Sequence, residues 1–445
     1  MSLACRFRVV VAIGLPWLGG SLLASGQEPL RLEQHFTAGD QYGVKARSEV
    51  SGTLTLPTDK GKPPLPPVTL RGDSAIEYDE RVLRAEDGKL QKTVRIFRRA
   101  DLQRTIDDRP ERVSVRPAVR RMVVLREGPA KKAPFSPDGP LTWGEIDIVR
   151  TDVFLPALAG LLPSGAVKPG DSWKASADAV QELTGLATLD QGQLDCRLEQ
   201  VTRGQARVGL TGTVQGLTED GTNRQQLKGH FLFDMAANRL VHVELRGIRS
   251  LLAADGREVG RVEGRFVLET QVARTPVPEL TDEALRGVTL DPSADNTLLL
   301  FDNPEVGVRF LYPRRWRVAS AGTNQVTVDA PDGSGFLLTV EASARTPSAE
   351  QFLNESRGFL EGKKARIVRV EPPQTVQANP PREHFALEVE LNGQKFLMDY
   401  HVSRQTDGGA IVAARLLPGD QEALRREVEG IARTVVITKR IDPGK

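Results

Sequence analysis

Residues 42–56 read YGVKARSEVSGTLTL, and this stretch decides how the N-terminal half of the chain folds. Its even positions carry apolar or small side chains, whereas most odd positions carry charged or polar ones. Successive side chains of a β-strand point to opposite faces, so this period of two predicts one long strand that is buried on a single face. Strands of this kind are typical of an antiparallel sheet with one covered face.

The same alternation recurs along the chain as far as about Thr275. Further stretches lie at 70–78, in part at 113–124, and at 206–217 and 261–270. Residues 231–233 and 240–245 flank a turn at 236–238 and predict a hairpin. Long strands in one sheet coil strongly, so we expect a curved sheet that wraps around another part of the chain.

An apolar insertion between Leu141 and Leu186 is the candidate for what the sheet encloses. Residues 153–162 are almost wholly apolar, a length that suits a buried helix and is too short to span a bilayer. A second short helix is expected at 176–183. The insertion either plugs the sheet or forms a lid over a pocket, and in the second case the candidate ligand-binding residues are Trp173, Val153, Phe154, Leu155 and Leu158.

The end of this insertion also carries a family resemblance. The residues concerned are Pro163, Val167, Lys168, Gly170, Asp171, Ser172 and Trp173. On this motif, the region from about Leu30 to Thr275 resembles a family of exported bacterial proteins of unknown function. Their sheets are similar to the open half-barrels of envelope lipoprotein carriers, so the resemblance implies a sheet that wraps around an apolar ligand.

The first residues predict export. Arg6 and Arg8 precede an apolar core at 9–23 and small residues at 24–26, which is the pattern of a secretory signal peptide. We therefore expect residues 1–26 to be a cleaved signal, with no transmembrane segment, and a protein that acts in the periplasm or outside the cell. Cys196 is then the one remaining cysteine, and we expect it to be a small core side chain.

Charge is balanced over the 445 residues, at a formal +2, but it is not uniform. Residues 91–132 contain 13 Lys or Arg against five Asp or Glu. Two interpretations remain open for this stretch: contact with an anionic surface such as lipid headgroups, or a solvated sheet face. The residues that would contact an anionic surface are Arg95, Arg98, Arg116, Arg120 and Arg121. Phe97 is the single aromatic there, so we expect no nucleic-acid partner.

Residues 276–297 are the expected linker between a domain at 27–275 and a second domain at 298–440, because they are rich in proline and lose the apolar period. In the second domain, Pro313 should end a strand and Trp316 should fold back over the core. A capping box at Ser348 and Gln351 predicts a helix that ends near Gly362, and a last helix should start after Asp420.

The turn Asn392-Gly393 fixes the register of a hairpin, because a two-residue turn there pairs positions whose numbers sum to 785. One face then holds Phe385 opposite Tyr400, and the other holds His384 opposite His401. We predict no metal site; if the chain binds a metal, the ligands are His384, His401 and Asp399. The alternative is a solvated histidine pair on the outer face.

The second domain resembles the PsbP-like family. The opening motif is Gly307-Val308-x-Phe310-x-Tyr312-Pro313-x-x-Trp316, and residues 410–434 match the family's final strand and helix. The resemblance implies an α/β sandwich with an antiparallel sheet and a role in binding or assembly. No ligand set of the family transfers to this chain.

The expected fold class is thus α+β: a long-stranded antiparallel half-barrel with inserted helices, followed by the PsbP-like sandwich. The five histidines show no metal-binding spacing, and no nucleophile motif is present, so we expect neither catalysis nor a cofactor. The expected function is a non-catalytic exported envelope protein that binds or assembles with another envelope protein. The alternatives are a carrier or sensor of an apolar ligand such as a lipid, and a hydrolytic enzyme with an unrecognised site.

Overall fold

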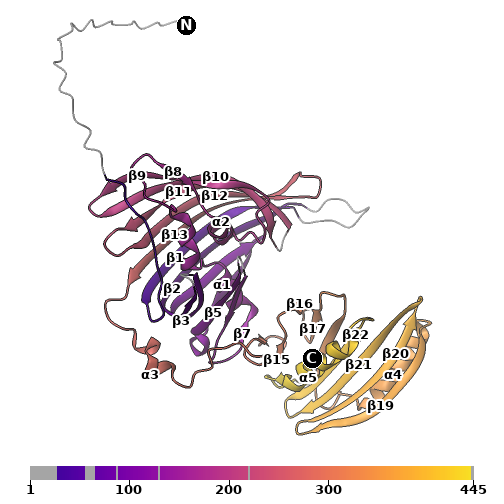
Figure 1. Cartoon of the computed structure of the whole chain (residues 1–445). Coiled ribbons are helices and arrows are strands. Elements are labelled where there is room, and N and C mark those ends of the chain that lie inside the picture. Colours follow the sequence, from indigo (N-terminus) through magenta and orange to yellow (C-terminus); the bar gives the residue numbers. More distant parts are fainter. Residues whose placement is uncertain (1–27, 56–65, 87–88, 129–130, 219–220, 442–445) are drawn as a thin grey trace, which may run out of the picture.

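The computed structural model describes residues 28–55, 66–86, 89–128, 131–218 and 221–441. The predicted signal peptide at 1–26 lies outside these residues. The chain is mostly antiparallel β-sheet with few helices, arranged as one large curved sheet followed by a smaller sandwich (Figure 1). The coarse α+β prediction is therefore confirmed.

The large sheet has 12 strands, and β1 (Gln41–Leu54) lies in its middle. The other strands are β2 (Val68–Glu86), β3 (Lys89–Ile106), β4 (Arg109–Ser114), β5 (Arg121–Gly128), β6 (Lys131–Phe135), β8 (Ser172–Lys174), β9 (Gln191–Thr202), β10 (Gln205–Thr218), β11 (Gly221–Asp234), β12 (Arg239–Leu252) and β13 (Glu258–Val272). Their order is β6-β5-β3-β2-β1-β13-β12-β11-β10-β9-β8, with β4 beside β3. The alternation at 42–56 thus marks the strand that pairs the first part of the domain (β2) with its last strand (β13).

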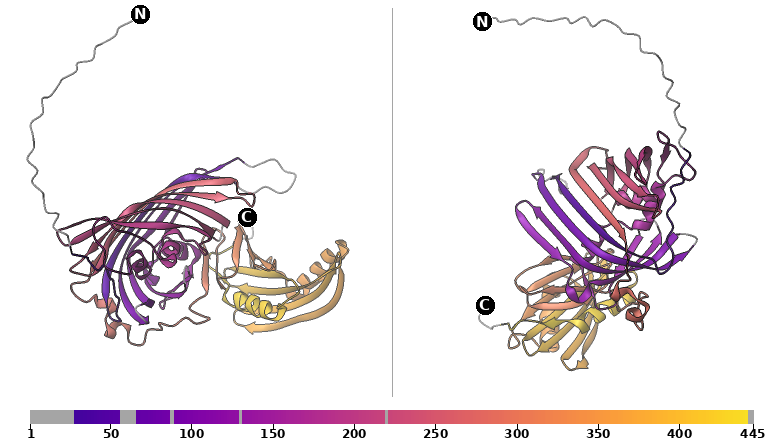
Figure 2. Two further views of the ribbon diagram at one scale, coloured as in Figure 1. Left: turned by 45° about the horizontal axis from the view of Figure 1, so that its top comes forward. Right: turned by 90° about the vertical axis from the view of Figure 1, so that its left-hand side faces the viewer.

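The curved sheet wraps around the apolar insertion, as Figure 2 shows. We call residues 143–184 the plug: α1 (Trp143–Arg150), the 3-10 helix η2 (Leu155–Leu161) and α2 (Ala177–Thr184). A capping box between Thr142 and Glu145 starts α1, and the Ser176 side chain caps α2. The predicted apolar helix at 153–162 is present as η2.

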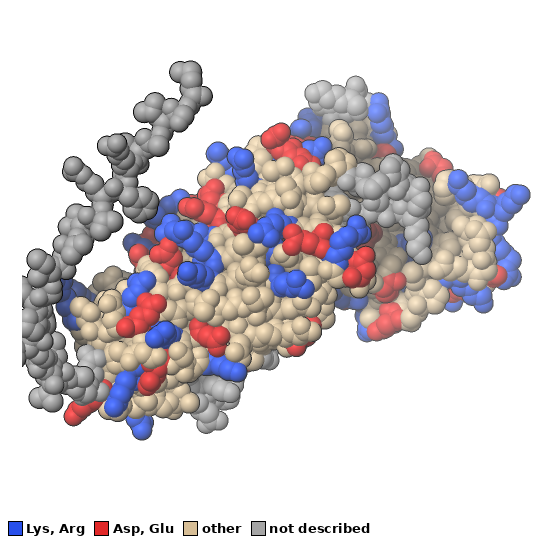
Figure 3. Space-filling view, turned by 90° about the horizontal axis from the view of Figure 1, so that it is seen from above, with Lys and Arg blue, Asp and Glu red and all other residues tan. Residues whose placement is uncertain are grey.

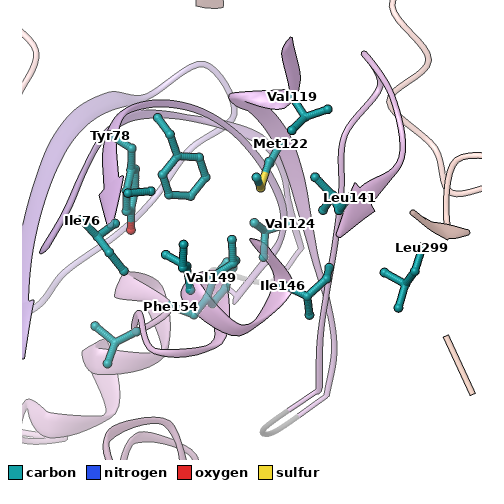
Figure 4. Packing of buried hydrophobic residues seen from close by; sticks show 14 of the residues in the cluster. Ile76, Tyr78, Val119, Met122, Val124, Leu141, Ile146, Val149, Phe154 and Leu299 are labelled. Carbon is teal, nitrogen blue, oxygen red and sulfur yellow. The ribbon is translucent and has the colours of Figure 1, made fainter. Parts of the chain in front are cut away.

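Apolar contacts hold the plug against the concave face of the sheet. Val149 and Phe154 of the plug lie among Ile76, Tyr78 and Val124 of the sheet (Figure 4). Phe154 and Val124 are both fully buried. Cys196 is buried in the same core, and burial raises the pKa of its thiol to about 12.

The predicted linker is folded onto the outside of this sheet. It contains the 3-10 helix η3 (Pro278–Leu280) and α3 (Asp282–Leu285). Leu280 and Leu285 are buried against Val94 and Ile96 of β3 and Phe135 of β6. Strand β3 is therefore covered on both faces, by the plug inside and by residues 277–290 outside.

The second domain contains a seven-stranded antiparallel sheet between two helices. In sheet order the strands are β16 (Arg317–Ala321), β17 (Gln325–Asp329), β18 (Gly335–Glu341), β22 (Gly408–Leu416), β21 (Gln394–Gln405), β20 (Pro381–Leu391) and β19 (Arg366–Ala378). Helix α4 (Ala349–Gly362) packs on β19 and β20, and α5 (Gln421–Thr434) packs on the opposite face, on β21 and β22. Both predicted caps, Ser348 and Asp420, are present.

The predicted hairpin register is confirmed. Strands β20 and β21 pair Phe385 with Tyr400 and His384 with His401. Asn392 and Gly393 both have positive φ, 52° and 77°, as the two-residue turn requires.

A small sheet joins the two domains. Its strands, in the order β23-β15-β14-β7, are β23 (Val436–Ile437), β15 (Val308–Tyr312), β14 (Leu299–Asn303) and β7 (Leu141–Thr142). The parallel pairing of β7 with β14 places Leu141 of the first domain beside Leu299 of the second (Figure 4). Strand β15 ends before Pro313, and Trp316 is fully buried as predicted. A 3-10 helix, η1 (Pro117–Val119), completes the elements.

Candidate ligand-binding site

The plug covers only one part of the concave face, and the rest is an open groove. On β1, Tyr42, Val44 and Ala46 are buried beneath the plug. The same inward alternation continues through Val50 and Leu54, but these side chains are partly exposed, Val50 by 37%. The apolar face of β1 therefore extends beyond the segment that covers it.

The groove has a volume of about 650 Å³. Its lining comes from five neighbouring strands and from the end of the plug at Leu183. The apolar lining residues are Val50, Leu54, Leu70, Leu183, Leu227, Leu245, Leu251, Val262 and Phe266. A volume of roughly 300–1,000 Å³ with mostly apolar walls is typical of small-molecule sites.

Glycines keep the groove open. Gly72, Gly264 and Gly247 lie in one cross-strand row that also contains Val50. A Cβ atom added to Gly247 would lie 2.6 Å from Cδ2 of Leu227, and one added to Gly264 would lie 3.3 Å from Cγ1 of Val50. The side chains of Leu227 and Val50 thus lie next to Gly247 and Gly264. Because these glycines have no side chains of their own, the groove stays open above them.

One end of the groove is polar. Arg249 lines it and donates from Nε to Oδ1 of Asn223 at 2.7 Å. Gln225 donates to the carbonyl of Thr184 at 2.8 Å and so ties the sheet to the end of α2. This arrangement suits a molecule with one polar end and a long apolar part.

The residues predicted to bind a ligand lie in the core instead of the groove. Val153, Phe154, Leu155 and Leu158 are buried between the plug and the sheet. Trp173 is half-buried and donates from Nε1 to the carbonyl of Leu161 at 2.8 Å. In the sequence, the groove residues show the same alternation of apolar and polar side chains as the core residues. They differ only in whether the plug covers them.

Arg95 lies beneath the plug, so neither interpretation of the basic stretch, contact with an anionic surface or a solvated sheet face, holds for this residue. Its Nε lies 2.9 Å from Oε1 of Glu80, and one terminal nitrogen lies 2.7 Å from Oδ2 of Asp152 in the plug. All three side chains are at most 1% exposed. The guanidinium also lies 4.4 Å from the ring centre of Tyr78. A buried charge is retained only when it is paired, and these two carboxylates pair it.

The other four arginines singled out from the basic stretch, Arg98, Arg116, Arg120 and Arg121, also have acidic partners. Arg98 and Arg120 pair with Glu279, Arg116 with Glu145, and Arg121 with Asp138. A hydrogen bond from Arg98 lowers the pKa of Glu279 to about 2. Basic and acidic side chains are interspersed on the surface seen from above (Figure 3). Acidic residues from other segments therefore pair with these four arginines.

The histidine pair of the second domain lies under α5, not on a solvated face. Nε2 of His384 lies 2.8 Å from Oδ1 of Asp399, and Nε2 of His401 lies 3.3 Å from Oδ2. Asp399 is fully buried, and His401 is 3% exposed. Arg425 of α5 places its Nε 3.2 Å from Asp399 and also pairs with Glu371. The three predicted ligands do come together, but Arg425, which sequence reasoning missed, already supplies a positive charge.

Burial sets the protonation of this cluster. It lowers the pKa of His401, although Asp399 opposes the shift. Burial also disfavours the charged form of Asp399, but the hydrogen bond with His384 and the close contact with His401 outweigh it and hold the pKa of that carboxyl well below its usual range.

We expect the free energy of unfolding to fall as the pH drops from about 7 to 5, partly because of His401. The unfolded histidine titrates near ~6.5, whereas the folded one has a lowered pKa, so the unfolded state binds the proton more readily below that pH. In His401→Gln this contribution is absent, and stability should depend less on pH. The charged groups around His401 are Asp399, His384, Arg382 and Arg425.

Urea unfolding followed by circular dichroism at several pH values measures this dependence. His35→Gln is the matched control, because the His35 side chain is 73% exposed. Equal pH dependence in His401→Gln and in the parent protein would contradict the assignment.

Comparison with known proteins gives only distant structural likeness. No protein-family model and no curated protein matches the sequence. A cyanobacterial PsbP from Synechocystis is similar over 32% of this chain and 92% of its own, with 9% identity and a TM-score of 0.25. The Ran-binding protein Mog1p of Saccharomyces cerevisiae is similar over 32% and 96%, with 11% identity and a TM-score of 0.25.

A structure of lipovitellin, described for its lipid–protein interactions, is similar over 54% of this chain. The match spans 26% of the lipovitellin chain, with 11% identity and a TM-score of 0.30. These TM-scores are below 0.5, so neither a family nor a function follows from the likenesses. Within the described parts of the chain, none of the helices is both long enough and apolar enough to cross a membrane.

Proposed function

We propose that this chain is a non-catalytic binding protein that holds a lipid or another molecule with an acyl chain in the groove of its first domain. The observation that carries the proposal is the uncovered part of the apolar concave face beyond the plug. We further propose that the chain is exported and that it acts in the periplasm or outside the cell as a carrier or sensor.

An open apolar groove has a free-energy cost that a ligand can remove. Removing apolar surface from water stabilises a complex by roughly 25 cal/mol for each Å² that is buried. Contiguous exposed apolar surface on a folded protein is typical of an interaction site. An acyl chain suits this groove because it is flexible enough to follow a curved sheet, and Arg249 with Asn223 offers a polar end for its head group.

A charge placed in the groove should weaken binding. Val50→Lys puts an ammonium group among apolar side chains, and a bound acyl chain would have to bury it. We expect the affinity for a dansyl-labelled fatty acid to fall on the order of tenfold or more, since burying an unpaired charge is costly. Fluorescence titration of the purified chain measures this change.

Ser51→Lys is the matched control. Ser51 is the next residue of β1, is exposed, and points to the opposite face of the sheet. It adds the same charge to the same strand and should leave the affinity unchanged. If both variants bind the fatty acid like the parent protein, the groove is not the binding site.

Native mass spectrometry of the chain purified without detergent tests the proposal independently. Extra mass that is lost on denaturation supports the carrier function and identifies the ligand class. Bare polypeptide mass, together with no fatty-acid binding, would contradict it. Assembly with another protein would then be the better proposal, because the edge strand β19 exposes Val368 by 49% and Val376 by 42%.

A further inference from the structure

Two histidines and one glutamate meet on the outer face of the large sheet, away from the groove. His230 of β11 is directly opposite Glu244 of β12. His242 lies two residues before Glu244 and so shares its face. One ligand atom from each of the three side chains lies within 4.8 Å of the other two, and the imidazole ring centres are 5.6 Å apart.

We propose that His230, His242 and Glu244 form a binding site for a divalent transition metal of the Zn²⁺ type. Zn²⁺ takes imidazole nitrogen and carboxylate oxygen at ~2.0–2.2 Å, which separates tetrahedral ligand atoms by roughly 3.5 Å. The three ligand atoms lie within 4.8 Å of one another, so binding requires them to move closer together. Three protein ligands leave the fourth position open to water or to a further ligand.

A β-bulge places two of the ligands. Phe233 pairs with Leu240 and Leu232 pairs with His242, so Val241 is an extra residue in β12. Leu240 is buried in the core. In a regular strand His242 would share the inward face of Leu240, but the extra residue turns His242 outward. Bulges commonly re-aim side chains beside functional sites, and this one keeps Leu240 inside while presenting His242 and Glu244 together.

Two arginines orient the carboxylate of this cluster. Arg265 donates to Oε1 of Glu244 at 3.0 Å, and Arg246 lies 3.8 Å from the same oxygen. Both contacts are to Oε1, so they orient the carboxylate, and we assign Oε2 as the metal ligand. The histidines and Glu244 are each half-buried in the middle of the sheet, and β10 and β13 hold the two strands from either side.

A second carboxylate lies next to His230. Gly209 of β10 is opposite His230, and a Cβ atom there would lie 2.5 Å from Oε1 of Glu199. Glycine at this position therefore makes room for the Glu199 side chain. Nε of Arg207 lies 2.9 Å from Oε2 of Glu199.

Zn²⁺ titration of the untagged, chelator-treated chain tests the proposal. We expect one equivalent to bind with a dissociation constant below about 1 μM, and the double variant His230→Gln/His242→Gln to bind at least about tenfold more weakly. Co²⁺ in place of Zn²⁺ should give the visible absorption of a tetrahedral site in the parent protein but not in the variant. His35→Gln removes an exposed histidine elsewhere and should leave both readouts unchanged.

Each alternative result overturns the proposal. These results are equal Zn²⁺ affinity in the parent and double variant, no submicromolar binding in the parent, or loss of binding in His384→Gln/His401→Gln instead. The melting temperature without metal checks that the double variant is folded. Fatty-acid binding should survive the double substitution, so the metal site and the groove are tested separately.

Discussion

Replacing Arg95 with Met lowers the free energy of unfolding by about 3–5 kcal/mol, because it leaves Glu80 and Asp152 buried without their cation. Urea unfolding followed by circular dichroism measures the loss. Arg99→Met, on the same strand, is the control. Its ion pair with Asp101 is exposed and should contribute no more than ~1 kcal/mol.

The triple variant Arg95→Met/Glu80→Leu/Asp152→Leu separates the ion cluster from the volume that it fills. Apolar replacement of a whole buried ion cluster is often neutral or stabilising, so this variant should recover most of the lost stability. If Arg95→Met is as stable as the parent protein, Arg95 does not hold the plug to the sheet. If the triple variant is no more stable than Arg95→Met, the unpaired carboxylates are not the cause of the loss.

Trp316→Ala should destabilise the second domain by about 3–5 kcal/mol, since it removes a fully buried indole. The ring centre of Trp316 lies 5.6 Å from that of Phe336, and Nε1 donates to Oε2 of Glu427 at 2.6 Å. Thermal unfolding followed by near-ultraviolet circular dichroism measures the loss.

Two controls accompany this substitution. Trp316→Phe keeps most of the apolar contact and loses the hydrogen bond, so it should cost roughly 1 kcal/mol. Phe359→Ala removes an aromatic side chain that is 65% exposed and should change stability by less than ~0.5 kcal/mol. Equal losses in Trp316→Ala and Phe359→Ala would show that Trp316 is not a core residue.

These two sites differ in how far the sequence could predict them. The burial of Trp316 follows from its own neighbours, because Pro313 ends the strand and turns the chain back. The hairpin at Asn392-Gly393 is predictable for the same reason, since a two-residue turn fixes the pairing. Arg95 belongs to a basic stretch and looks like a surface residue. Its partners, Glu80 and Asp152, come from another strand and from the plug, and no local pattern connects them.

The groove was missed for a related reason. The alternation along β1 predicts that one face of the strand is apolar, but it does not predict which segment covers that face. Val44 and Val50 look alike in sequence, yet the plug covers the first and leaves the second partly exposed. The sequence of residues 153–162 is compatible with either a plug or a lid. It is buried as a plug, and the candidate site lies beside it.

The segment that folds onto the outside of β3 has a consequence for the order of synthesis. Strands β3, β5 and β6 are made first, but Leu280 and Leu285, which cover their outer face, are made much later. Strand β7 likewise cannot pair until its partner β14 has been synthesised. A nascent chain that stops at Thr275 therefore exposes Val94, Ile96 and Phe135 to water. The first domain becomes complete only after synthesis has passed residue 300.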